Sequence, residues 1–389
     1  MSTAMSTATL TATLTPSSAM ADRPTIMFAG GGTGGHIFPN LAVVERLRDQ
    51  GVRFEPHFLI SRRPLDAAIL NEAGITATPL AIEPPGRRPW GWPRRLRLAM
   101  SGIRAASRVT RSTGAAAVVA TGGFVSVAAA RAARRRGLPL AVVNLDAVPG
   151  RANRLLVGRA ERVFTAYPWP AVRAAESIGV PLRRRAVDEA DSATARSAMG
   201  LDPSRETLLI VGGSQGAGTL NAMGPKSARA LGGPLPDWQW LHLAGSETEA
   251  ATLGDAYRAA GVEARVLAFS NDMGRVWRSA TVAVSRAGAG SVAEAWANGV
   301  PTIFLPYPHH RDQHQRLNAA PMAASGGALI IEDAVDAQRN ADAVARAVMQ
   351  LVGDVDGLES MRQALQRSRP TDGAAAVARW VAGIVGGTA

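Results

Sequence analysis

Twice along the chain, a short apolar run passes directly into a glycine-rich turn and then into a helical pattern. The first unit begins with TIMFAGGGTGGHIFPN at residue 25, and the second is ETLLIVGGSQGAGTLN at residues 206–221. Short apolar strands that alternate with helices predict a parallel sheet covered on both faces. Because the pattern starts again in the second half of the chain, we predict two such sheets in tandem.

Further strand patterns keep the same rhythm in both halves. They cover residues 54–60, 115–123 and 138–146 in the first half, and 238–245, 264–270, 280–288 and 300–308 in the second. The charged segment 180–204 has little apolar periodicity and separates the two groups. The predicted fold class is therefore α/β, with two Rossmann-like domains whose parallel sheets face each other across a cleft. Ligands in such folds bind at the carboxyl ends of the strands, so the cleft is the expected site.

Composition narrows the function classes. The chain of 389 residues is long enough for two domains, and with 47% apolar and 19% charged residues it has the composition of a globular protein. It contains no cysteine, which excludes disulfides and thiolate metal sites. The net charge is +12 and Lys226 is the only lysine. Arginine favours bidentate phosphate contacts, but genomic base composition explains this usage equally well.

The first 22 residues, of which MSTAMSTATLTATLTPSSAM is the main part, are of low complexity. They lack the charged and long apolar regions of a signal peptide, and we interpret them as a disordered tail or an artefact of start-codon choice. No apolar run reaches the roughly 18 residues of a membrane span. The expected location is cytoplasmic, with any membrane contact peripheral.

The first glycine-rich turn, FAGGGTGGHIFPN, has two interpretations. Gly30, Gly32 and Gly35 satisfy the dinucleotide pattern G-x-G-x-x-G, which also requires an acidic residue about twenty positions later. The second strand ends in LISRRP instead, so residues 61–63 would have to accept a 2′-phosphate. Alternatively His36, directly after the glycines, takes a proton at the mouth of the cleft as a neutral imidazole. A purely structural histidine is about as common in such a turn.

The second half carries two anion-binding elements. VGGSQGAGTLN places Ser214 and Gln215 at a strand-to-helix turn, and the segment 288–291 opens another helix whose N-terminus suits a diphosphate. Glu294 lies one turn into that helix, where its carboxylate could bind ribose hydroxyls. An isolated helical glutamate is usually only solvated, and the position of Glu294 within this arrangement is what favours binding.

Taken in order, these motifs resemble the MurG family within glycosyltransferase family 28. Its members are the UDP-N-acetylglucosamine:undecaprenyl-diphospho-muramoylpentapeptide N-acetylglucosaminyltransferases of peptidoglycan synthesis. The resemblance covers about residues 24–385. It rests on GGGTGGHIFPNLAV, ATGGFVSV, AVPGRANRLL, VGGSQGAGTLN, FSNDM, SRAGAGSVAEAWANGVPTIFLPYP and DQHQRLNA. Each piece is modestly specific, and the ordered set is highly specific.

The resemblance implies the GT-B fold. Residues 23–184 would form the acceptor and membrane domain, 185–365 the UDP-GlcNAc-binding domain, and 366–389 a C-terminal helix that packs back on the first domain. It also implies an inverting transfer that needs no metal and no cofactor. N-acetylglucosamine (GlcNAc) would pass from UDP-GlcNAc to the 4-hydroxyl of the muramoyl sugar on lipid I, giving lipid II.

The resemblance also assigns site residues, with His36 as the catalytic base. Donor-binding residues implied by the family are Arg183, Ser214, Gln215, Phe269, Met273, Ser291, Glu294, His314 and Gln315. Residues implied on the acceptor and diphosphate side are Thr33, Gly34, Gly35, Gly122, Gly123, Asp146 and Asn153.

The chain departs from the family pattern on the acceptor side. Where the family has HEQNAVPG, this sequence has VVNLDAVPG, so Asn144 replaces a glutamate and Asp146 replaces an asparagine. The lost glutamate is an acceptor-side carboxylate, which puts acceptor geometry or rate in question. Val180 replaces the asparagine of the family's NPVR, which weakens the assignment of Arg183.

The stretch 89–111, PWGWPRRLRLAMSGIRAASRVTR, interleaves tryptophan and aliphatic residues with arginines. It is either a helix packed on the core with a solvated basic face, or a patch that lies on anionic lipid. A lipid-linked acceptor favours the second interpretation, which places the protein peripherally at the cytoplasmic face of the cell membrane. No nucleic-acid recognition motif is present.

Three alternatives to this transferase remain open. A GT-B enzyme with another lipid acceptor would share the donor half. A noncatalytic relative that binds UDP-GlcNAc, or docks other cell-wall synthesis proteins, would be consistent with the lost glutamate. An NADP-dependent oxidoreductase would use the glycine fingerprint with Arg62 and Arg63.

Overall fold

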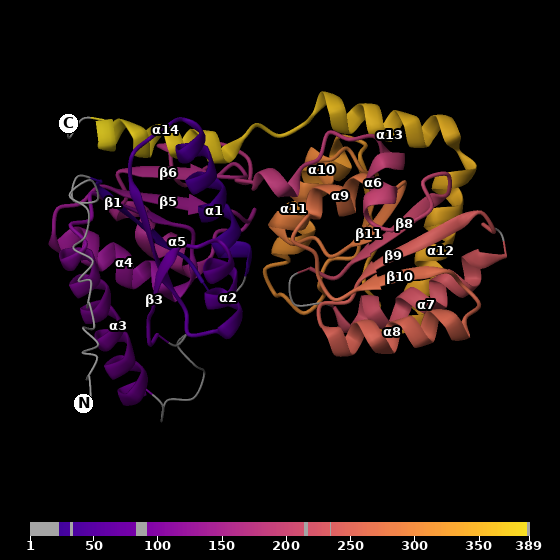
Figure 1. Cartoon of the computed structure of the whole chain (residues 1–389), viewed down its shortest axis with the longest axis horizontal. Coiled ribbons are helices and arrows are strands. Elements are labelled where there is room, and N and C mark those ends of the chain that lie inside the picture. The colour runs from indigo at the N-terminus through magenta and orange to yellow at the C-terminus, as the bar shows by residue number, and fades with distance from the viewer. Residues whose placement is uncertain (1–22, 32–33, 83–91, 214–216, 234, 387–389) are drawn as a thin grey trace, which may run out of the picture.

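The computed structural model describes residues 23–31, 34–82, 92–213, 217–233 and 235–386. Two α/β domains lie side by side along the long axis of the molecule, each built on its own parallel sheet (Figure 1). The chain crosses from the first domain to the second once, and its last helix returns to the first. The α/β prediction with two Rossmann-like domains is confirmed.

The first sheet has seven parallel strands in the order β3-β2-β1-β4-β5-β6-β7. Its strands are β1 Thr25–Ala29, β2 Glu55–Ile60, β3 Thr76–Pro79, β4 Ala117–Ala120, β5 Leu140–Asn144, β6 Arg162–Thr165 and β7 Ala175–Ser177. Its helices are α1 Gly34–Asp49, α2 Pro64–Glu72, α3 Trp92–Ser112, α4 Gly123–Arg135 and α5 Arg151–Leu156, followed by the short 3-10 helix Val157–Arg159.

The second sheet has six parallel strands in the order β10-β9-β8-β11-β12-β13. They are β8 Glu206–Val211, β9 Trp238–Leu243, β10 Ala264–Leu267, β11 Val282–Ser285, β12 Thr302–Phe304 and β13 Ala328–Ile330. The helices are α6 Ser192–Ala198, α7 Gly218–Gly232, α8 Glu247–Ala259, α9 Met273–Arg278, α10 Ala289–Ala297, α11 His314–Ala324, α12 Ala337–Gly353 and α13 Val355–Arg367.

Each central strand contributes side chains to two hydrophobic cores, one on either face of its sheet. In β1, Ile26 and Phe28 pack with α1, while Met27 and Ala29 pack with α4 on the opposite face. The strands β8 and β11 do the same in the second sheet. Because side chains alternate across a strand, a strand buried on both faces must be apolar throughout, which is why these runs stand out in the sequence.

The strand order reverses between β1 and β4 in the first sheet and between β8 and β11 in the second. Such a reversal leaves a crevice at the carboxyl ends of the strands, because the connections on either side of it leave in opposite directions. The turns after β4, β8 and β11 carry Gly122, Gly213 and Gly288, and the turn after β1 leads directly into the first turn of α1, which carries His36. Both sheets therefore present their glycine-rich turns at switch points.

The two chain crossings lie next to each other. The first crossing, residues 178–191, leads from β7 to α6 and includes the 3-10 helix Arg184–Ala186. The second, residues 368–372, leads from α13 to α14 Gly373–Gly386. Helix α14 packs on α1 in the first domain, where Val377 and Val381 are fully buried and Arg46 Nε bonds Asp372 Oδ2 at 2.6 Å. The two crossings form the connection about which the domains can move.

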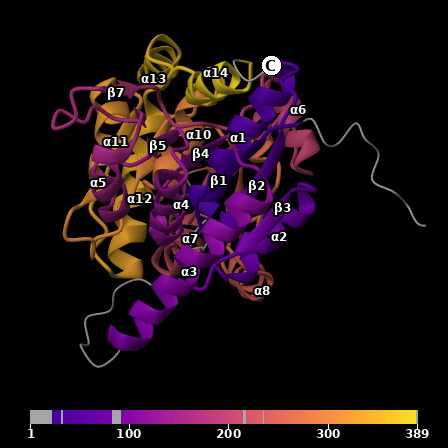
Figure 2. The same cartoon turned by 90° about the vertical axis from the view of Figure 1, so that its left-hand side faces the viewer.

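Helix α3 reaches away from the body of the first domain at its N-terminal end (Figure 2). Ala106 and Thr110 are buried against the domain, whereas Leu96 and Met100, nearer the start, are 63% and 44% exposed. Among the residues that the structure describes, no helix is both long enough and apolar enough to span a bilayer.

Candidate active site

His36 lies in the first turn of α1, directly after the turn that follows β1. Its backbone carbonyl accepts hydrogen bonds from Thr121 Oγ1 at 2.7 Å and from Asn40 Nδ2 at 3.4 Å. Thr121 follows β4, so the first turn of α1 is tied to the neighbouring strand across the switch point. These bonds fix the backbone from which the imidazole projects.

The ring orientation of His36 determines its tautomer. Nδ1 lies 3.3 Å from the carbonyl oxygen of Gly31, which can only accept a hydrogen bond. Nδ1 therefore carries the proton in the neutral ring, and Nε2 is left with a lone pair. Nε2 has no hydrogen-bond partner among the described residues. This is the protonation state that a general base requires.

Gly122 lies against the free nitrogen of His36. A Cβ at Gly122 would lie 3.1 Å from His36 Nε2, and φ of 128° is in a region that other residues rarely adopt. Gly123 also has a positive φ, and a Cβ there would lie 2.8 Å from the carbonyl oxygen of Gly31. The glycine pair therefore keeps the space beside Nε2 open.

Asn153, on α5, lies on the other side of that space. It is 5% exposed, and its Nδ2 donates to Asn144 Oδ1 at 3.1 Å. Its Oδ1 is buried without a hydrogen-bond partner and lies 3.6 Å from the Cβ position of Gly122. An unsatisfied buried amide oxygen is costly, so it is suited to accept a bond from a ligand hydroxyl.

Asn144 and Asp146, which depart from the family pattern, turn away from the imidazole. Asn144 Nδ2 donates to the Asp146 carbonyl at 2.8 Å and to Thr165 Oγ1 at 3.2 Å. The Asp146 carboxylate accepts from Asn318 Nδ2 at 3.0 Å, in the second domain. Among the described residues, no carboxylate hydrogen-bonds the His36 ring. The Asp146 carboxylate therefore bonds a side chain of the second domain and does not bond the His36 ring.

Asn318, on α11, joins the two domains. Its Oδ1 accepts from the Ala147 backbone N–H at 2.8 Å, and its carbonyl oxygen accepts from Tyr167 Oη at 3.1 Å. Its Nδ2 bonds Asp146 and also the Ala287 carbonyl at the end of β11. Asn318 is fully buried, and burial together with the Asp146 charge raises the pKa of Tyr167. A single amide thus links the loop after β5 to the turn after β11.

The donor half is organised by a buried ion pair. Arg286, just after β11, pairs with Asp333 at 2.8 Å and donates to Thr219 at the start of α7. It ties the turn after β8 to the turn after β11, which are the two predicted anion-binding elements. Thr33, Ser214 and Gln215 lie outside the described residues.

Helix α10 presents a free N-terminus at the second of these turns. Its cap residue, Gly288, contributes no side-chain bond, so the first backbone N–H groups are available to an anion. Ser291 lies within the first turn and is half-buried. Glu294 Oε2 accepts from Trp277 Nε1 at 3.0 Å, and burial raises the pKa of Glu294 to about 7.

The remaining predicted donor residues lie around this turn. Phe269 is 66% exposed, in the loop that leads to Met273 at the start of α9. His314 Nδ1 pairs with Asp312 at 2.8 Å, and Gln315 Oε1 accepts from the Tyr307 N–H at 2.8 Å. His314 and Gln315 begin α11, one turn before Asn318, which places them beside the contact between the domains.

Two family models match the chain. The one described as "Glycosyltransferase family 28 N-terminal domain" matches residues 26–165, and "Glycosyltransferase family 28 C-terminal domain" matches residues 207–376. The chain belongs to glycosyltransferase family 28. It is therefore a glycosyltransferase, and the predicted family is confirmed.

Curated members of family 28 with similar sequences carry one name, "UDP-N-acetylglucosamine--N-acetylmuramyl-(pentapeptide) pyrophosphoryl-undecaprenol N-acetylglucosamine transferase". One from Nocardioides sp. is 37% identical over 366 residues, covering 92% of this chain and 97% of the relative. One from Nitrosococcus oceani is 36% identical over 356 residues, covering 90% and 94%.

Solved structures show the same architecture. Acinetobacter baumannii MurG superimposes with a TM-score of 0.71 at 25% identity, covering 92% of this chain and 99% of that structure. The calicheamicin glycosyltransferase CalG4 has a TM-score of 0.63 at 16% identity, covering 94% and 98%. The second likeness shows the GT-B fold alone, because this fold carries several chemistries.

Within this family 28 fold, the predicted acceptor residues come together. Gly122, Gly123 and Asn153 surround His36, and Asp146 lies at the boundary between the domains. Gly34 and Gly35 begin α1, one turn from the same place.

Arg183 has a different environment from the one implied for it. Its Nε bonds Glu45 Oε1 at 2.9 Å, and its guanidinium lies 5.9 Å from the ring centre of Phe38. These residues line a cavity of about 260 Å³ that Asn271 of the second domain also reaches. The bond to Glu45 uses one of the five N–H donors of Arg183 and neutralises part of its charge.

Sequence reasoning missed the residues that join and fix the site. Asn318 belongs to the motif DQHQRLNA and Thr121 to the motif ATGGFVSV, but the sequence alone indicated no role for either residue. The signal for Asn318 was its spacing, because it lies three residues after Gln315 and so shares a helix face with it. Nothing in the sequence marked Tyr167.

Proposed function

We propose that this family 28 enzyme transfers GlcNAc from UDP-GlcNAc to the 4-hydroxyl of MurNAc-pentapeptide on undecaprenyl diphosphate, converting lipid I to lipid II. The observation that carries this proposal is the free Nε2 of His36, which faces the open space beside Gly122. The names of the relatives support the choice of donor and acceptor.

The proposed chemistry is a single displacement with inversion. The acceptor 4-hydroxyl gives its proton to His36 Nε2 and attacks C1 of the sugar. The bond between C1 and the diphosphate oxygen breaks, and its electron pair leaves with UDP. Asn153 Oδ1 is placed to orient an acceptor hydroxyl. The N–H groups at the start of α10 stabilise the charge that develops on the departing diphosphate.

The family resemblance implies that this transfer needs no metal. Among the described residues, no group of three or more His, Asp or Glu side chains is placed to hold a metal ion. In the proposal, backbone N–H groups and the donor-side residues meet the charge of UDP.

A lipid II synthesis assay tests the proposal directly. Purified protein with UDP-GlcNAc and lipid I should form lipid II, and other polyprenyl-linked sugars should react more slowly. Faster turnover of another lipid acceptor would favour the alternative GT-B enzyme. UDP-GlcNAc binding without turnover would favour a noncatalytic relative. Calorimetry with NADPH provides the third comparison, because NADPH binding without UDP binding would overturn the transferase.

Donor affinity should depend on the ionisation of Glu294. If its carboxylate accepts bonds from the ribose hydroxyls, UDP binds the ionised form, whereas burial raises the pKa of Glu294 to about 7. Below that pH the free protein is protonated on Glu294 and must release this proton when UDP binds. The dissociation constant for UDP should therefore rise about tenfold from pH 8 to pH 6. Calorimetry in buffers of different ionisation enthalpy should also show proton release.

The matched variant is Glu294→Gln, which keeps the shape of the side chain and cannot titrate. Wild type and variant bind the same UDP, so titration of the phosphates cancels in the comparison. The variant should bind UDP more weakly than wild type at pH 8. Its dissociation constant should also lack the roughly tenfold rise between pH 8 and pH 6 that the titration of Glu294 causes in wild type. Equal UDP affinity at pH 8 would contradict the ribose contact.

We also propose that the start of α3 lies on the anionic surface of the membrane, which would place the enzyme peripherally at its cytoplasmic face. Leu96 and Met100 are exposed there beside arginines, and α3 reaches away from the domain (Figure 2). Residues 83–91, which include Trp90, lie outside the described residues. Other cell-wall synthesis proteins remain expected partners to which we assign no surface.

The double variant Leu96→Glu/Met100→Glu should bind vesicles of anionic phospholipid at least about tenfold more weakly, since each buried apolar side chain contributes roughly 1.5–3 kcal/mol. Vesicle co-sedimentation measures the effect. Val355→Glu, at a 74% exposed position on α13 of the other domain, is the control and should bind normally. Wild-type partitioning of the double variant would remove α3 from the membrane contact.

A further inference from the structure

A second cavity lies at the edge of the second sheet opposite to the donor turns. It has a volume of about 550 Å³, within the usual range for small-molecule sites. Its walls include Glu206, Thr281 and Pro301, which stand at or just before the amino ends of β8, β11 and β12. The donor turns follow the carboxyl ends of β8 and β11, so this cavity is separate from the proposed UDP site.

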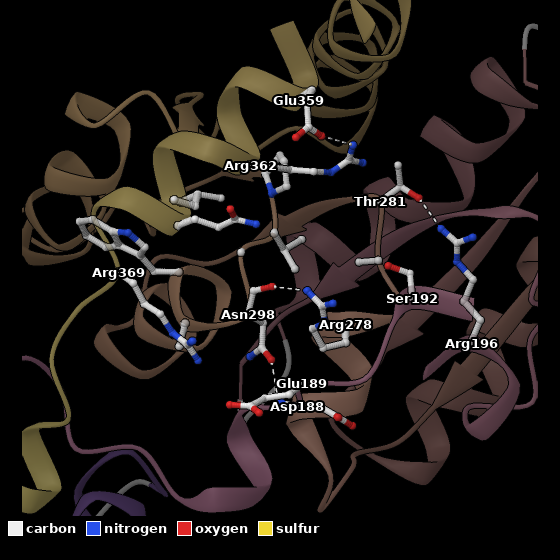
Figure 3. Close-up of a pocket in the computed structure, with 18 of the residues that line it drawn as sticks. Asp188, Glu189, Ser192, Arg196, Arg278, Thr281, Asn298, Glu359, Arg362 and Arg369 are labelled. Carbon is white, nitrogen blue, oxygen red and sulfur yellow. Dashed lines mark hydrogen bonds and ion pairs between the residues drawn. The ribbon is translucent and has the colours of Figure 1, made fainter. Parts of the chain in front are cut away.

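Both chain crossings between the domains form part of its wall. Asp188 and Glu189 come from the first crossing, and Arg369 comes from the second (Figure 3). The first crossing is fastened to the second domain, because the Asp188 N–H donates to Asn298 Oδ1 at 3.0 Å and Arg278 Nε donates to the Ala190 carbonyl at 2.9 Å. The second is held by Trp296 Nε1, which donates to Ser368 Oγ at 3.1 Å.

Two arginines in the cavity wall, Arg278 and Arg369, have no carboxylate partner among the described residues, and a third, Arg362, pairs with a carboxylate that is more than half exposed. Arg278 bonds only backbone carbonyl groups, those of Ala190 and Asn298. Arg362 forms an ion pair with Glu359 at 3.6 Å, which is longer than a hydrogen bond, and, against the effect of burial, its charge also helps to lower the pKa of Glu206. Arg369 has no hydrogen-bond or ion-pair partner among the described residues. Each guanidinium has five N–H donors, so most donors of these three groups remain available.

Most of the carboxylates around the cavity are already engaged. Glu206 pairs with the buried Arg196 at 2.7 Å and also accepts from Thr281. Asp188 accepts from the Ala190 N–H at 2.8 Å and lies 3.5 Å from Arg275. Only Glu189, which is exposed, offers a negative charge without a described partner. The wall holds four carboxylates and four arginines, and Glu359 pairs with Arg362. The groups without a described ion-pair partner are Arg278, Arg369 and Glu189, so the uncommitted charge is positive.

We propose that this cavity binds a small anion with two or more phosphate groups and that the bound anion restrains the movement of the domains. An anion held between Arg369 on the second crossing and Arg278 or Arg362 on the second domain would fasten that crossing to the domain. The first crossing is already fastened to the same wall through Arg278 and Asn298. Bidentate arginine contacts suit phosphate oxygens. Because domains joined by two short crossings move about them, the bound anion should lower turnover.

Inorganic pyrophosphate is the probe, used on the full chain in calorimetry with UDP present at saturation to fill the donor site. Under these conditions the wild type should bind one pyrophosphate in addition to UDP. In the double variant Arg362→Gln/Arg369→Gln this affinity should fall at least about tenfold, since two charge-assisted contacts are lost. The control is Arg367→Gln, at the end of the helix α13 that carries Arg362 but outside the cavity wall. Its pyrophosphate affinity should stay within about twofold of wild type. No further site in wild type, or equal affinity in the double variant, overturns the proposal.

Two measurements guard against an indirect effect of the double variant. Glu189→Gln removes the uncommitted negative charge and should tighten pyrophosphate binding by about two- to fivefold, which mere loss of structure would not do. Pyrophosphate should lower kcat of the wild type at saturating UDP-GlcNAc, and it should leave kcat of the double variant unchanged. Equal inhibition of both would place the inhibitory anion elsewhere, and an unchanged wild-type kcat would remove the restraint on domain movement.

Discussion

The variant His36→Ala is expected to lower turnover by about 10²- to 10⁴-fold, the usual contribution of a general base, while UDP-GlcNAc affinity stays within a few-fold of wild type. The reason is geometric. The Gly31 carbonyl holds the proton on Nδ1, so the ring offers Nε2 to the acceptor hydroxyl and makes no described contact with the donor half. Steady-state kinetics with lipid I and calorimetry with UDP-GlcNAc measure the two quantities.

His57→Ala is the matched control, because His57 lies in β2 and bonds Thr78 Oγ1 at 2.9 Å, away from the switch points. Its turnover should stay within about twofold of wild type. A His36→Ala enzyme that keeps wild-type turnover would show that another group takes the acceptor proton.

The sequence predicted the central strands because they are buried on both faces. In β1 and β8 successive side chains pack into different cores, so polar residues occur only at the amino ends of these strands, at Thr25, Glu206 and Thr207. The outer strands β3, β7 and β13 were not recognised, and neither was the short inner strand β6. The outer segments TATP, AES and ALI have three or four residues each and are mostly half-buried or exposed, so tertiary pairing rather than local pattern makes them strands.

Motif order predicted which residues lie near His36, but it could not predict how they are held. The glycine pattern indicated Gly122 and Gly123, and the structure adds that both have positive φ beside the imidazole. The roles of Asp146 and Asn318 depend on a contact between residues 172 positions apart. No periodicity encodes such a contact, because it forms only when the two sheets meet.

Removing the Asn318 side chain is expected to separate donor binding from catalysis. Asn318→Ala loses the amide bonds to Asp146, Ala147 and Ala287. It leaves the part-buried Ala147 N–H and the buried Ala287 carbonyl unpaired. A displacement of about 1 Å between donor and acceptor can cost about 10²-fold in rate, so kcat should fall by about 10- to 100-fold. UDP affinity should change less than kcat, because the bond that Asn318 loses in the donor domain is to the Ala287 carbonyl and not to the N–H groups at the start of α10.

Variants of Asp146 determine whether the contact needs a charge or only an acceptor. Asp146→Asn keeps an oxygen that can accept from Asn318 Nδ2, whereas Asp146→Ala keeps none. Kinetics should show kcat within about threefold of wild type for Asp146→Asn and, for Asp146→Ala, a loss no larger than that of Asn318→Ala, which removes three amide bonds rather than one. The double variant Asp146→Ala/Asn318→Ala should be little worse than Asn318→Ala alone, since that variant already removes the bond to Asp146. Additive losses would mean that Asp146 and Asn318 act on the reaction separately, and a large loss in Asp146→Asn would mean that the carboxylate charge itself serves the acceptor.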